Sequence, residues 1–340
     1  AKLGDYVKIR TGKLDANASS ENGQYPFFTC AVEPLKIDNY SYDCECVLVA
    51  GNGDLNVKYF NGKFDAYQRT YIIESLNDRV LYVPYLYYFL DKYVETLRHQ
   101  SIGGVIKYIK LGNLTDASIP VIGIEKQTGI VKNLKKVDEL IFLRKQQLAK
   151  LDALVNARFV EMFGDPVKNT MDWEIKPLSE LGELNRGVSK ARPRNSPELL
   201  GGPYPLIQTG EVANAKTYIT SFNSTYSEKG LAQSKMWPKG TLCITIAANI
   251  AQTSILTFDA CFPDSVVGFI SRNMTNELFI HYWFSFFQKI LDEQAPQVAQ
   301  KNINLKILSE LNVIVPPLSL QNRFAAFVER VDQQKRTVLQ

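Results

Sequence analysis

An internal repeat is the feature that most restricts the fold of this 340-residue chain. Phe64-Asp65-Ala66 returns as Phe258-Asp259-Ala260, and Gln127 returns as Gln321, with an offset of 194 residues in each case. Each copy consists of a globular segment of mixed helix and strand, a short hinge with proline, and a charged amphipathic helix. The repeat predicts two related domains, each followed by a helix, which suits a protein that holds a two-part target at a fixed separation.

The two globular segments differ in their loops. Residues 204–207 (YPLI) correspond to residues 25–28 (YPFF) with an offset of 179 instead of 194, so about 15 residues enter the second copy before Phe258. Strand-like runs alternate with glycine and asparagine turns in both copies. We therefore expect two domains with a shared framework and different loops.

A long amphipathic helix is predicted over residues 125–163, where Gly164-Asp165-Pro166 ends it. Apolar residues recur along it at alternating steps of three and four, which is the spacing of a coiled-coil seam. A solitary helix of this length is improbable, so the seam needs a partner. The predicted interface residues on this helix are Leu134, Val137, Ile141, Leu148, Leu151, Val155 and Met162.

The second copy supplies the partner helix, which begins near Gln321. In a chain ordered domain, helix, domain, helix, the two helices can run antiparallel and be related by a pseudo-twofold axis. Gln340 matches Gln146, so we expect the second helix to be truncated by about 17 residues relative to the first. The predicted interface residues on this helix are Phe324, Val328 and Val331.

The composition limits the class of protein. With 45% hydrophobic and 22% charged residues, the chain can bury two globular cores. The sequence has no apolar run long enough to span a membrane and no signal pattern at its N-terminus, so we expect a cytoplasmic protein with no membrane partner. The five scattered cysteines argue against a disulfide framework, and Cys44 and Cys46 lack the further ligands that a zinc site needs.

The sequence lacks the motifs of common catalytic sites. No segment matches Gly-x4-Gly-Lys-Ser/Thr, and Pro316-Pro317 lies at the second hinge instead of in the tetrapeptide of an amino-methyltransferase. His99 and His281 are the only histidines, and both lie in aromatic helical stretches where a structural role is expected. We predict no catalytic residue, no metal site and no cofactor bound by this chain.

Basic segments indicate a polyanionic partner more clearly than the net charge of +4 does. Residues 186–194 (RGVSKARPR) hold four basic residues and no acidic one, and a glycine and a proline mark them as a loop. The first copy opens similarly, with Lys8, Arg10 and Lys13 around Gly12. Such loops can donate hydrogen bonds to phosphates and base edges, although a solvated surface turn has the same composition.

Three segments together resemble a known family. They are residues 159–166 (FVEMFGDP), which close the first helix, residues 204–211 (YPLIQTGE), and residues 315–321 (VPPLSLQ), which open the second helix. In combination they are similar to the DNA specificity subunit of type I restriction-modification systems, and the resemblance covers essentially the whole chain. The first hinge departs from the pattern, with the single Pro120 in place of two prolines, while Gln127 keeps its place.

The resemblance implies a non-catalytic DNA reader with an α+β fold. Two similar α/β target recognition domains, residues 1–122 and 165–317, would each read one half of a bipartite site in double-stranded DNA. Two long antiparallel helices, residues 123–164 and 318–340, would form an intramolecular coiled coil that sets the gap. Two methyltransferase (modification) subunits would dock on the helices, bind S-adenosylmethionine and methylate adenine, and restriction or translocase subunits are further candidate partners.

The candidate DNA-binding residues are basic and amide side chains of predicted loops. In the first domain they are Lys8, Arg10, Lys13, Asn52, Lys58, Arg69 and Lys107, and in the second they are Arg186, Lys190, Arg192, Arg194, Gln208, Asn249, Gln252, Gln300, Lys301 and Asn302. The loop around Gly103-Gly104 matches residues 297–302 in position, which singles out this pair of loops. Two other interpretations stay open: a scaffold that binds protein partners, and the recognition portion of a fused modification enzyme.

Overall fold

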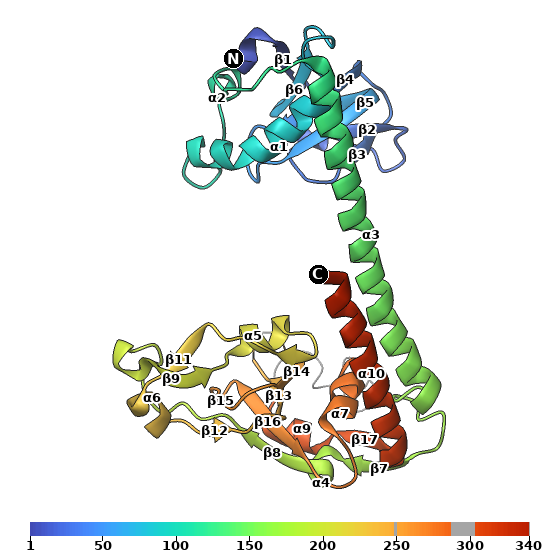
Figure 1. The fold of residues 1–340 in the computed structure, drawn as a ribbon, viewed down its shortest axis with the longest axis vertical. Coiled ribbons are helices and arrows are strands. Elements are labelled where there is room, and N and C mark those ends of the chain that lie inside the picture. The colour runs from blue at the N-terminus through green and yellow to red at the C-terminus, as the bar shows by residue number, and fades with distance from the viewer. Residues whose placement is uncertain (248–249, 287–302, 340) are drawn as a thin grey trace. The chain divides into compact units, whose positions relative to one another are not determined.

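The structure, a computed structural model, describes residues 1–247, 250–286 and 303–339 (Figure 1). The chain divides into two compact units, Ala1–Leu143 and Arg144–Gln340, which have separate hydrophobic cores. The division falls inside α3 (Ile124–Phe163), so this predicted long helix is present and belongs to both units. Within the described ranges, no helix combines the length and apolar composition that crossing a bilayer requires.

A six-stranded sheet forms the centre of the first unit (Figure 1). The strands are β1 (Val7–Thr11), β2 (Tyr25–Phe28), β3 (Leu35–Ile37), β4 (Tyr42–Ala50), β5 (Val57–Ala66) and β6 (Thr70–Ser75), and the helices are η1 (Leu3–Asp5), η2 (Ala16–Ala18), α1 (Val83–Gln100) and α2 (Leu111–Thr115). The strand order is β1-β6-β4-β5-β2-β3. β2 and β5 pair in parallel, and the other neighbours are antiparallel.

Both faces of this sheet are covered, because alternate residues of β4 belong to different hydrophobic clusters. Val47 and Val49 pack in the cluster that includes α1, whereas Cys46 and Leu48 pack with Phe64 in another cluster. Successive side chains of a strand point to opposite faces. The C-terminal half of β4 is therefore a continuous buried run.

The sequence of α1 explains its position. Pro84 occupies the first turn, where the missing N–H has no helical partner to lose. Leu86, Leu90, Val94 and Leu97 recur every three or four residues, and all four are buried. This apolar face packs on β4 and β5.

The second unit has more strands, in shorter pieces. Its strands are β7 (Glu174–Pro177), β8 (Gly182–Arg186), β9 (Leu200–Leu206), β10 (Tyr218–Ile219), β11 (Ser224–Tyr226), β12 (Met236–Trp237), β13 (Leu242–Thr245), β14 (Thr253–Leu256), β15 (Ala260–Cys261), β16 (Val266–Ser271) and β17 (Asn312–Val315). Its helices are α4 (Leu178–Leu181), η3 (Pro197–Leu199), α5 (Thr209–Asn214), α6 (Glu228–Ala232), α7 (Glu277–Phe284), α9 (Leu305–Glu310) and α10 (Leu318–Leu339).

The second unit repeats the pairing order of the first with one strand divided. β8, β16, β13 and β14 are neighbours in the same succession as β1, β6, β4 and β5. β15 pairs in parallel with β9, as the end of β5 pairs in parallel with β2. The long β5 of the first unit therefore corresponds to β14 and β15 together.

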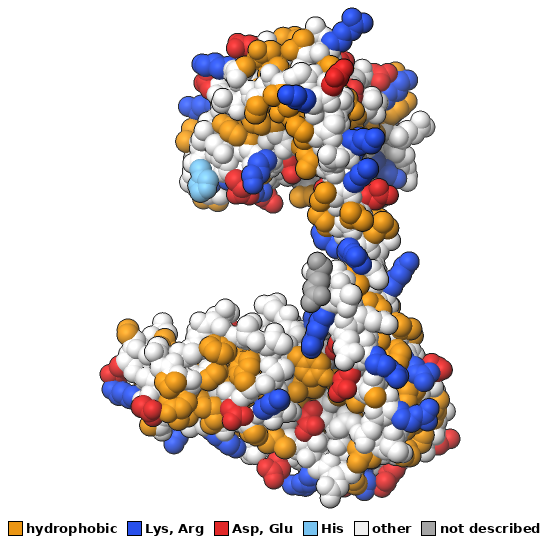
Figure 2. All heavy atoms as spheres, in the orientation of Figure 1, with side chains coloured by type: hydrophobic (Ala, Val, Ile, Leu, Met, Phe, Trp, Pro, Cys, Tyr) orange, Lys and Arg blue, Asp and Glu red, His pale blue; other side chains and the backbone are white. Residues whose placement is uncertain are grey.

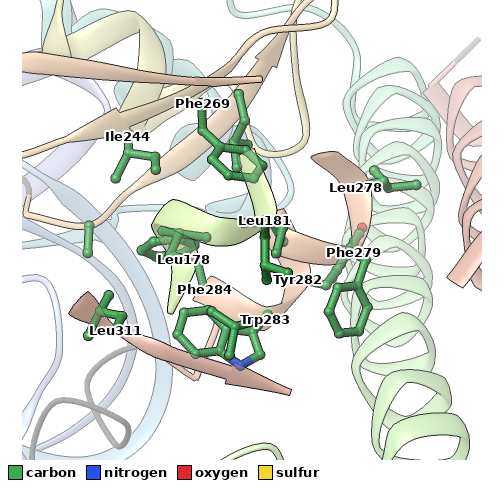
Figure 3. Packing of buried hydrophobic residues seen from close by; sticks show 14 of the residues in the cluster. Leu178, Leu181, Ile244, Phe269, Leu278, Phe279, Tyr282, Trp283, Phe284 and Leu311 are labelled. Atoms are coloured by element: carbon green, nitrogen blue, oxygen red, sulfur yellow. The ribbon is translucent and has the colours of Figure 1, made fainter. Parts of the chain in front are cut away.

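The core of the second unit lies between its central sheet and α7, and it extends to α3 (Figure 3). Leu181 of α4 and Phe269 of β16 belong to the same cluster as Phe279 of α7. The ring centre of Phe279 lies 5.5 Å from that of Phe159 and 5.0 Å from that of Phe163, both on α3. The end of α3 is therefore part of the domain core.

α3 and α10 run antiparallel where they pack together in the second unit. The ring of Phe324, near the start of α10, lies 5.5 Å from the rings of both Phe159 and Phe163. Lys335, near the end of α10, pairs with Asp152 at 2.8 Å. Rising residue numbers on α10 match falling numbers on α3, which confirms the predicted antiparallel pairing within this unit.

The predicted seam on α3 is covered near its C-terminal end. Val155, Phe324, Val328 and Val331 are buried, Leu148, Leu151 and Met162 are half-buried, and Leu134, Val137 and Ile141 are 36%, 49% and 48% exposed. The reason is length, because α10 has 22 residues and α3 has 40. Leu134, Val137 and Ile141 lie on α3 before the stretch that packs with α10 in the second unit.

The buried apolar residues near the end of α3 also recur at a different spacing from the one that the sequence predicted. Val155, Phe159 and Phe163 succeed one another by four residues and are all buried. Alternating steps of three and four place Arg158 on the seam and omit the two phenylalanines. The guanidinium of Arg158 still contacts α10, where it lies 5.7 Å from the ring centre of Phe327. Packing against α7 as well as α10 explains the wider apolar face.

A buried glutamine fastens α3 to the first domain. Gln127 accepts a hydrogen bond from the N–H of Tyr82, the N-cap residue of α1, at 2.9 Å. Its amide group donates to the carbonyls of Val80 at 2.7 Å and Ile122 at 2.6 Å. The residue is fully buried, so its amide group joins the start of α3, the hinge and the start of α1.

Gln321 makes the same set of bonds at the start of α10. It accepts from the N–H of Asn276, the N-cap residue of α7, at 3.3 Å, and donates to the carbonyls of Met274 at 3.0 Å and Pro316 at 2.8 Å. The hydroxyl of Thr275 adds a fourth bond at 2.9 Å. Each backbone partner lies 194 residues after the corresponding partner of the first glutamine, so the sequence repeat is also a repeat of hydrogen bonds.

Candidate nucleic-acid interface

A glycine without room for a side chain leads into a loop at the same place in each unit. A Cβ on Gly12 would lie 2.1 Å from the carbonyl oxygen of Ala66, and one on Gly187 would lie 2.2 Å from that of Phe262. Each glycine also donates its N–H to the first residue of the neighbouring strand, β6 or β16, at 3.1 Å and 2.8 Å. The two loops therefore start from equivalent points of equivalent sheets.

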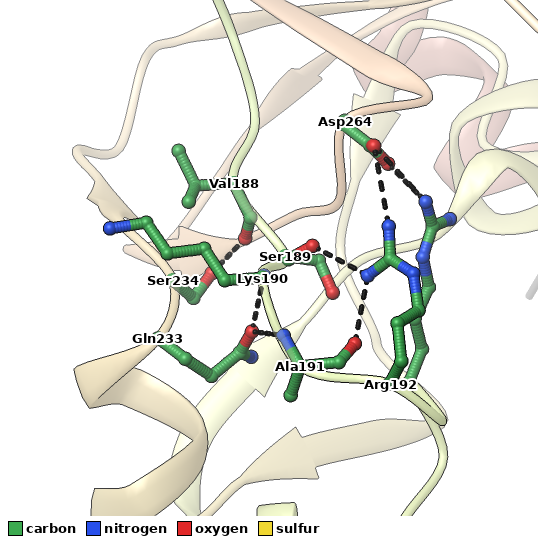
Figure 4. A network of polar contacts seen from close by, with 9 residues as sticks. Val188, Ser189, Lys190, Ala191, Arg192, Gln233, Ser234 and Asp264 are labelled. Carbon is green, nitrogen blue, oxygen red and sulfur yellow. Dashed lines mark hydrogen bonds and ion pairs between the residues drawn. The ribbon is translucent and has the colours of Figure 1, made fainter.

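Two residues that directly follow α6, Gln233 and Ser234, brace the loop of the second unit, residues 187–196, which we call the basic loop (Figure 4). Oε1 of Gln233 accepts hydrogen bonds from the N–H groups of Lys190 at 2.7 Å and Ala191 at 3.0 Å. The hydroxyl of Ser234 donates to the carbonyl of Val188 at 2.7 Å. These bonds fix the backbone of the loop and leave its basic side chains outside.

Two arginines of the basic loop gather on one carboxylate (Figure 4). Arg194 lies 2.7 Å from Asp264, and Arg192 lies 4.0 Å from it while also donating to the carbonyls of Ser189 and Ala191, both at 2.8 Å. The two arginine side chains remain 45% and 57% exposed. Exposed ion pairs contribute little to stability, so an anionic ligand can replace Asp264 at low cost.

Two further predicted residues join this group. Arg186 and Arg194 line a cavity of about 450 Å³ together with Asp264. Gln208 and Arg194 line another, of about 300 Å³, together with Ser189. The structure thus brings together five predicted DNA-binding residues of the second unit, namely Arg186, Lys190, Arg192, Arg194 and Gln208.

In the first unit, backbone contacts bring predicted residues to one end of the sheet. The N–H of Gly51 donates to the carbonyl of Arg69 at 2.8 Å, and the N–H of Gly53 donates to that of Lys107 at 2.9 Å. Lys13 follows Gly12, whose N–H donates to the carbonyl of Thr70, and Thr70 is the residue after Arg69. The members of this first-unit cluster are Lys13, Asn52, Lys58, Arg69 and Lys107.

Lys58 is joined to this cluster through side chains. Its ammonium group donates to Asn56, whose amide donates to the carbonyl of Cys30 at 2.8 Å, and the Cys30 thiol lies 3.6 Å from the carbonyl oxygen of Arg69. Burial lowers the pKa of the Lys58 ammonium below its ordinary value. The loop after Gly12 carries acidic as well as basic residues, so the positive charge here comes from four separate segments.

Lys8 and Arg10 lie apart from the first-unit cluster. The guanidinium of Arg10 lies 2.8 Å from the carboxylate of Glu74 and 4.8 Å from the ring centre of Tyr42, so it is held within the protein. Lys8 is opposite Glu74 in the ladder between β1 and β6. Lys8 is thus nearer the other end of β6, and the guanidinium of Arg10 extends towards that end to reach Glu74.

Gln252 lines a different cavity from the residues around the basic loop. It lines a cavity of about 490 Å³ together with His281 and Lys335. Burial lowers the pKa of His281 to about 4, and its Nδ1 lies 2.9 Å from the hydroxyl of Thr253, as suits a structural histidine. Four other predicted residues, Asn249, Gln300, Lys301 and Asn302, lie outside the described residues.

The sequence did not indicate the residues that hold the basic loop. Gln233 and Asp264 lie 43 and 70 residues from their partners Lys190 and Arg194. No spacing rule links such distant positions, because the contact depends on how the strands pair. Exposed basic and amide side chains that cluster in each of two related units are typical of a protein that binds nucleic acid.

Comparison with known proteins agrees with this class. The family model described as the type I restriction modification DNA specificity domain matches residues 1–153 and again residues 170–339. The chain therefore belongs to this family and contains two copies of its domain. Catalysis in type I systems is carried out by other subunits, so the chain is the DNA-recognition part and not an enzyme.

Individual relatives give the same result. The Type I restriction enzyme EcoDI specificity subunit of Escherichia coli is 28% identical over an alignment of 360 residues, gaps included. The alignment covers 97% of this chain and 80% of that protein. The crystal structure of the S subunit of a type I restriction-modification system from M. genitalium has the same fold, with a TM-score of 0.64 at 16% identity over 99% of this chain and 90% of that one. A chain from a structure of type I complex assembly and conformational transition matches over the same shares, with a TM-score of 0.58 at 16% identity.

Proposed function

We propose that this chain recognises a bipartite site in double-stranded DNA, with one half of the site bound by each unit. The observation that carries the proposal is the duplicated arrangement of basic and amide side chains. They lie near the start of β6 in the first unit and near the start of the equivalent strand, β16, in the second. In each unit the loop that begins at Gly12 or Gly187 is adjacent. Because the loops differ in length and sequence, the two half-sites are expected to differ.

The side chains of the two clusters would make two kinds of contact with DNA, to phosphates and to base edges. Lysine and arginine contacts to phosphates would supply most of the affinity and make it dependent on salt. Arginine, asparagine and glutamine side chains would read base edges in the major groove, where each base pair has its own pattern of donors and acceptors. The bracing of the basic loop by Gln233 and Ser234 would hold those groups in place before DNA binds.

The exposed part of α3 supports a role in docking other subunits. Residues 132–147 are all exposed, and Leu140, Ile141, Phe142 and Leu143 are each 48% to 59% exposed. Figure 2 shows hydrophobic side chains at the surface of the middle of α3. Successive helix residues are about 100° apart, so four in a row point in all directions around the helix. This one turn is apolar all round, within a stretch that otherwise carries many charged residues. An apolar turn that is exposed on every side is typical of a surface that other subunits cover.

We therefore assign this stretch to the docking of two methyltransferase subunits in the cytoplasm. Those subunits would bind S-adenosylmethionine and methylate adenine in each half-site, while α3 and α10 would set the gap between the half-sites. Restriction or translocase subunits would join the same complex.

The decisive experiment is methylome sequencing of cells that express the chain with its methyltransferase. A split motif with modified adenine on both strands is expected. A continuous motif, or no motif, would refute the proposal.

A charge-removal pair tests the separate roles of the two units. Arg192→Ala with Arg194→Ala should weaken DNA binding, reduce the salt slope by about 1 for each phosphate that is no longer neutralised, and relax only the second half-site. The control, Lys168→Ala with Arg272→Ala, removes the same charge from exposed positions; Arg272 follows β16 at the end opposite the basic loop. Equal loss of specificity in both half-sites would show that the units do not read separately.

A length change tests the role of α3. Two helical turns inserted after Gln146, in the exposed stretch, should lengthen the gap in the motif and leave both half-sites unchanged. The same methylome measurement reads the result. Altered half-sites with an unchanged gap would exclude a spacing role for the helix.

A further inference from the structure

Two aliphatic side chains stand at the tip of a loop in the first unit. The loop, residues 101–108, follows α1, and we call it the tip loop. Val105 is fully exposed, at 103%, and Ile106 is 62% exposed. Scattered apolar residues are normal on a protein surface, but two adjacent ones at the tip of a loop are positioned to meet a ligand.

Backbone contacts hold the tip loop in one shape. Ile102 and Tyr108 exchange hydrogen bonds of 3.0 Å and 2.9 Å at its base. Gly103 has a φ of +118°, in the region that favours glycine, and a Cβ there would lie 2.5 Å from the carbonyl oxygen of Ile106. The two aliphatic side chains therefore extend from a tight turn instead of a loose segment.

The surroundings of the tip loop are basic. Lys107 follows the tip directly, and its carbonyl accepts the bond from Gly53 that ties the loop to the first-unit cluster with Arg69 and Lys58. Such a setting favours a polyanion over an apolar protein surface. In the major groove of DNA, the apolar group on a base edge is the 5-methyl group of thymine.

We propose that Val105 and Ile106 are specificity-determining residues that read thymine in the first half-site through contact with its 5-methyl group. This inference rests on the proposed function and names the chemistry of one contact within it. It also explains why the tip has no hydrogen-bonding side chain of its own before Lys107.

The test uses the complex of the full chain with its methyltransferase and duplexes that carry the target. Each thymine of the first half-site is replaced singly by deoxyuridine, which removes only the methyl group, and affinity is measured by fluorescence anisotropy. At one or more positions the parent complex should lose affinity by roughly fourfold per methyl group removed. The Val105→Ala, Ile106→Ala variant should bind the thymine duplex more weakly and lose this sensitivity.

Leu76→Ala is the matched control, because Leu76 is 62% exposed and follows the opposite end of β6. It should leave both affinity and methyl sensitivity unchanged. The inference is overturned if parent and variant respond equally to every deoxyuridine, if the first half-site contains no thymine, or if the variant loses its methyltransferase while still discriminating thymine. A parent complex without any specific DNA binding overturns the proposed function as well, whereas specific binding without methyl sensitivity overturns this inference alone.

Discussion

Replacing Gln321 by leucine tests how each long helix is fastened to its domain. The change preserves side-chain size but leaves four fully or partly buried groups without their partner: the N–H of Asn276, the carbonyls of Met274 and Pro316, and the hydroxyl of Thr275. A buried polar group left unpaired costs about 1–3 kcal/mol. The hydroxyl can turn to another acceptor, so the three backbone groups set the magnitude. At that cost they sum to about 3–9 kcal/mol, so we expect the free energy of unfolding of the second unit to fall by at least about 3 kcal/mol.

The assay combines urea unfolding with hydrogen exchange read by mass spectrometry. Gln321→Leu should lower protection in α7 and α10, whereas Gln127→Leu should lower it in α1 and the start of α3. Gln334→Leu, at an exposed position of α10, is the control and should change stability by less than about 0.5 kcal/mol.

Two results would refute this reasoning. One is a loss below about 1 kcal/mol in both glutamine variants, which would mean that water or a small backbone shift replaces the bonds. The other is equal loss of protection in both units from a single substitution, which would mean that the two glutamines do not act locally.

Three further changes test the loop, the histidine and the helix pair. Gly187→Ala should destabilise the second unit by about 1–3 kcal/mol and weaken binding of its half-site, because the new Cβ meets backbone carbonyls. The control Gly210→Ala, at a glycine with open space around it, should change neither stability nor binding. Thermal melts and DNA-binding curves measure both effects. The folded state lowers the pKa of His281 to about 4, below its unfolded value of about 6.5. The stabilisation that the neutral imidazole gives is therefore complete above pH 6.5. As the pH falls towards 4, the free energy of unfolding decreases by up to about 3 kcal/mol. Urea unfolding at pH 7 and pH 4.5 should show a smaller loss for His281→Gln, and an equal loss in variant and parent would contradict the assignment. Asp152→Ala and Lys335→Ala should show a coupling of about 1 kcal/mol in a double-mutant cycle that weakens with salt, and zero coupling at low salt would show that the pair does not join the helices.

The sequence predicted the framework because the framework repeats. The fixed offset between Gln127 and Gln321 located both helix starts, and the structure shows that the same offset relates their backbone partners. Strand-like runs between glycine and asparagine turns were predicted, and one of them, residues 47–50, lies in the buried half of β4. Local signals such as these depend on residues that are close in sequence or in register.

Features that depend on tertiary packing could not be predicted from the sequence. The second unit has two strands, β14 and β15, where the first unit has the single β5, and the periodicity of the sequence does not show this division. The seam prediction omitted Phe159 and Phe163, because a heptad step assumes a single partner helix, whereas these rings contact α7 as well as α10. Arg10 was chosen for its charge, and the structure pairs it with Glu74.

The bare stretch of α3, residues 132–147, has a consequence for folding. A helix of this length with few tertiary contacts is only marginally stable in water. Every residue of this stretch is exposed, although the hydroxyl of Tyr88 donates a hydrogen bond to Asp138 at 2.6 Å. Its backbone hydrogen bonds should therefore open often in the free chain and rarely once other subunits cover it. Part of the free energy of assembly is then used to order this segment, and the exchange rate of its amides becomes a direct signal of whether the complex has formed.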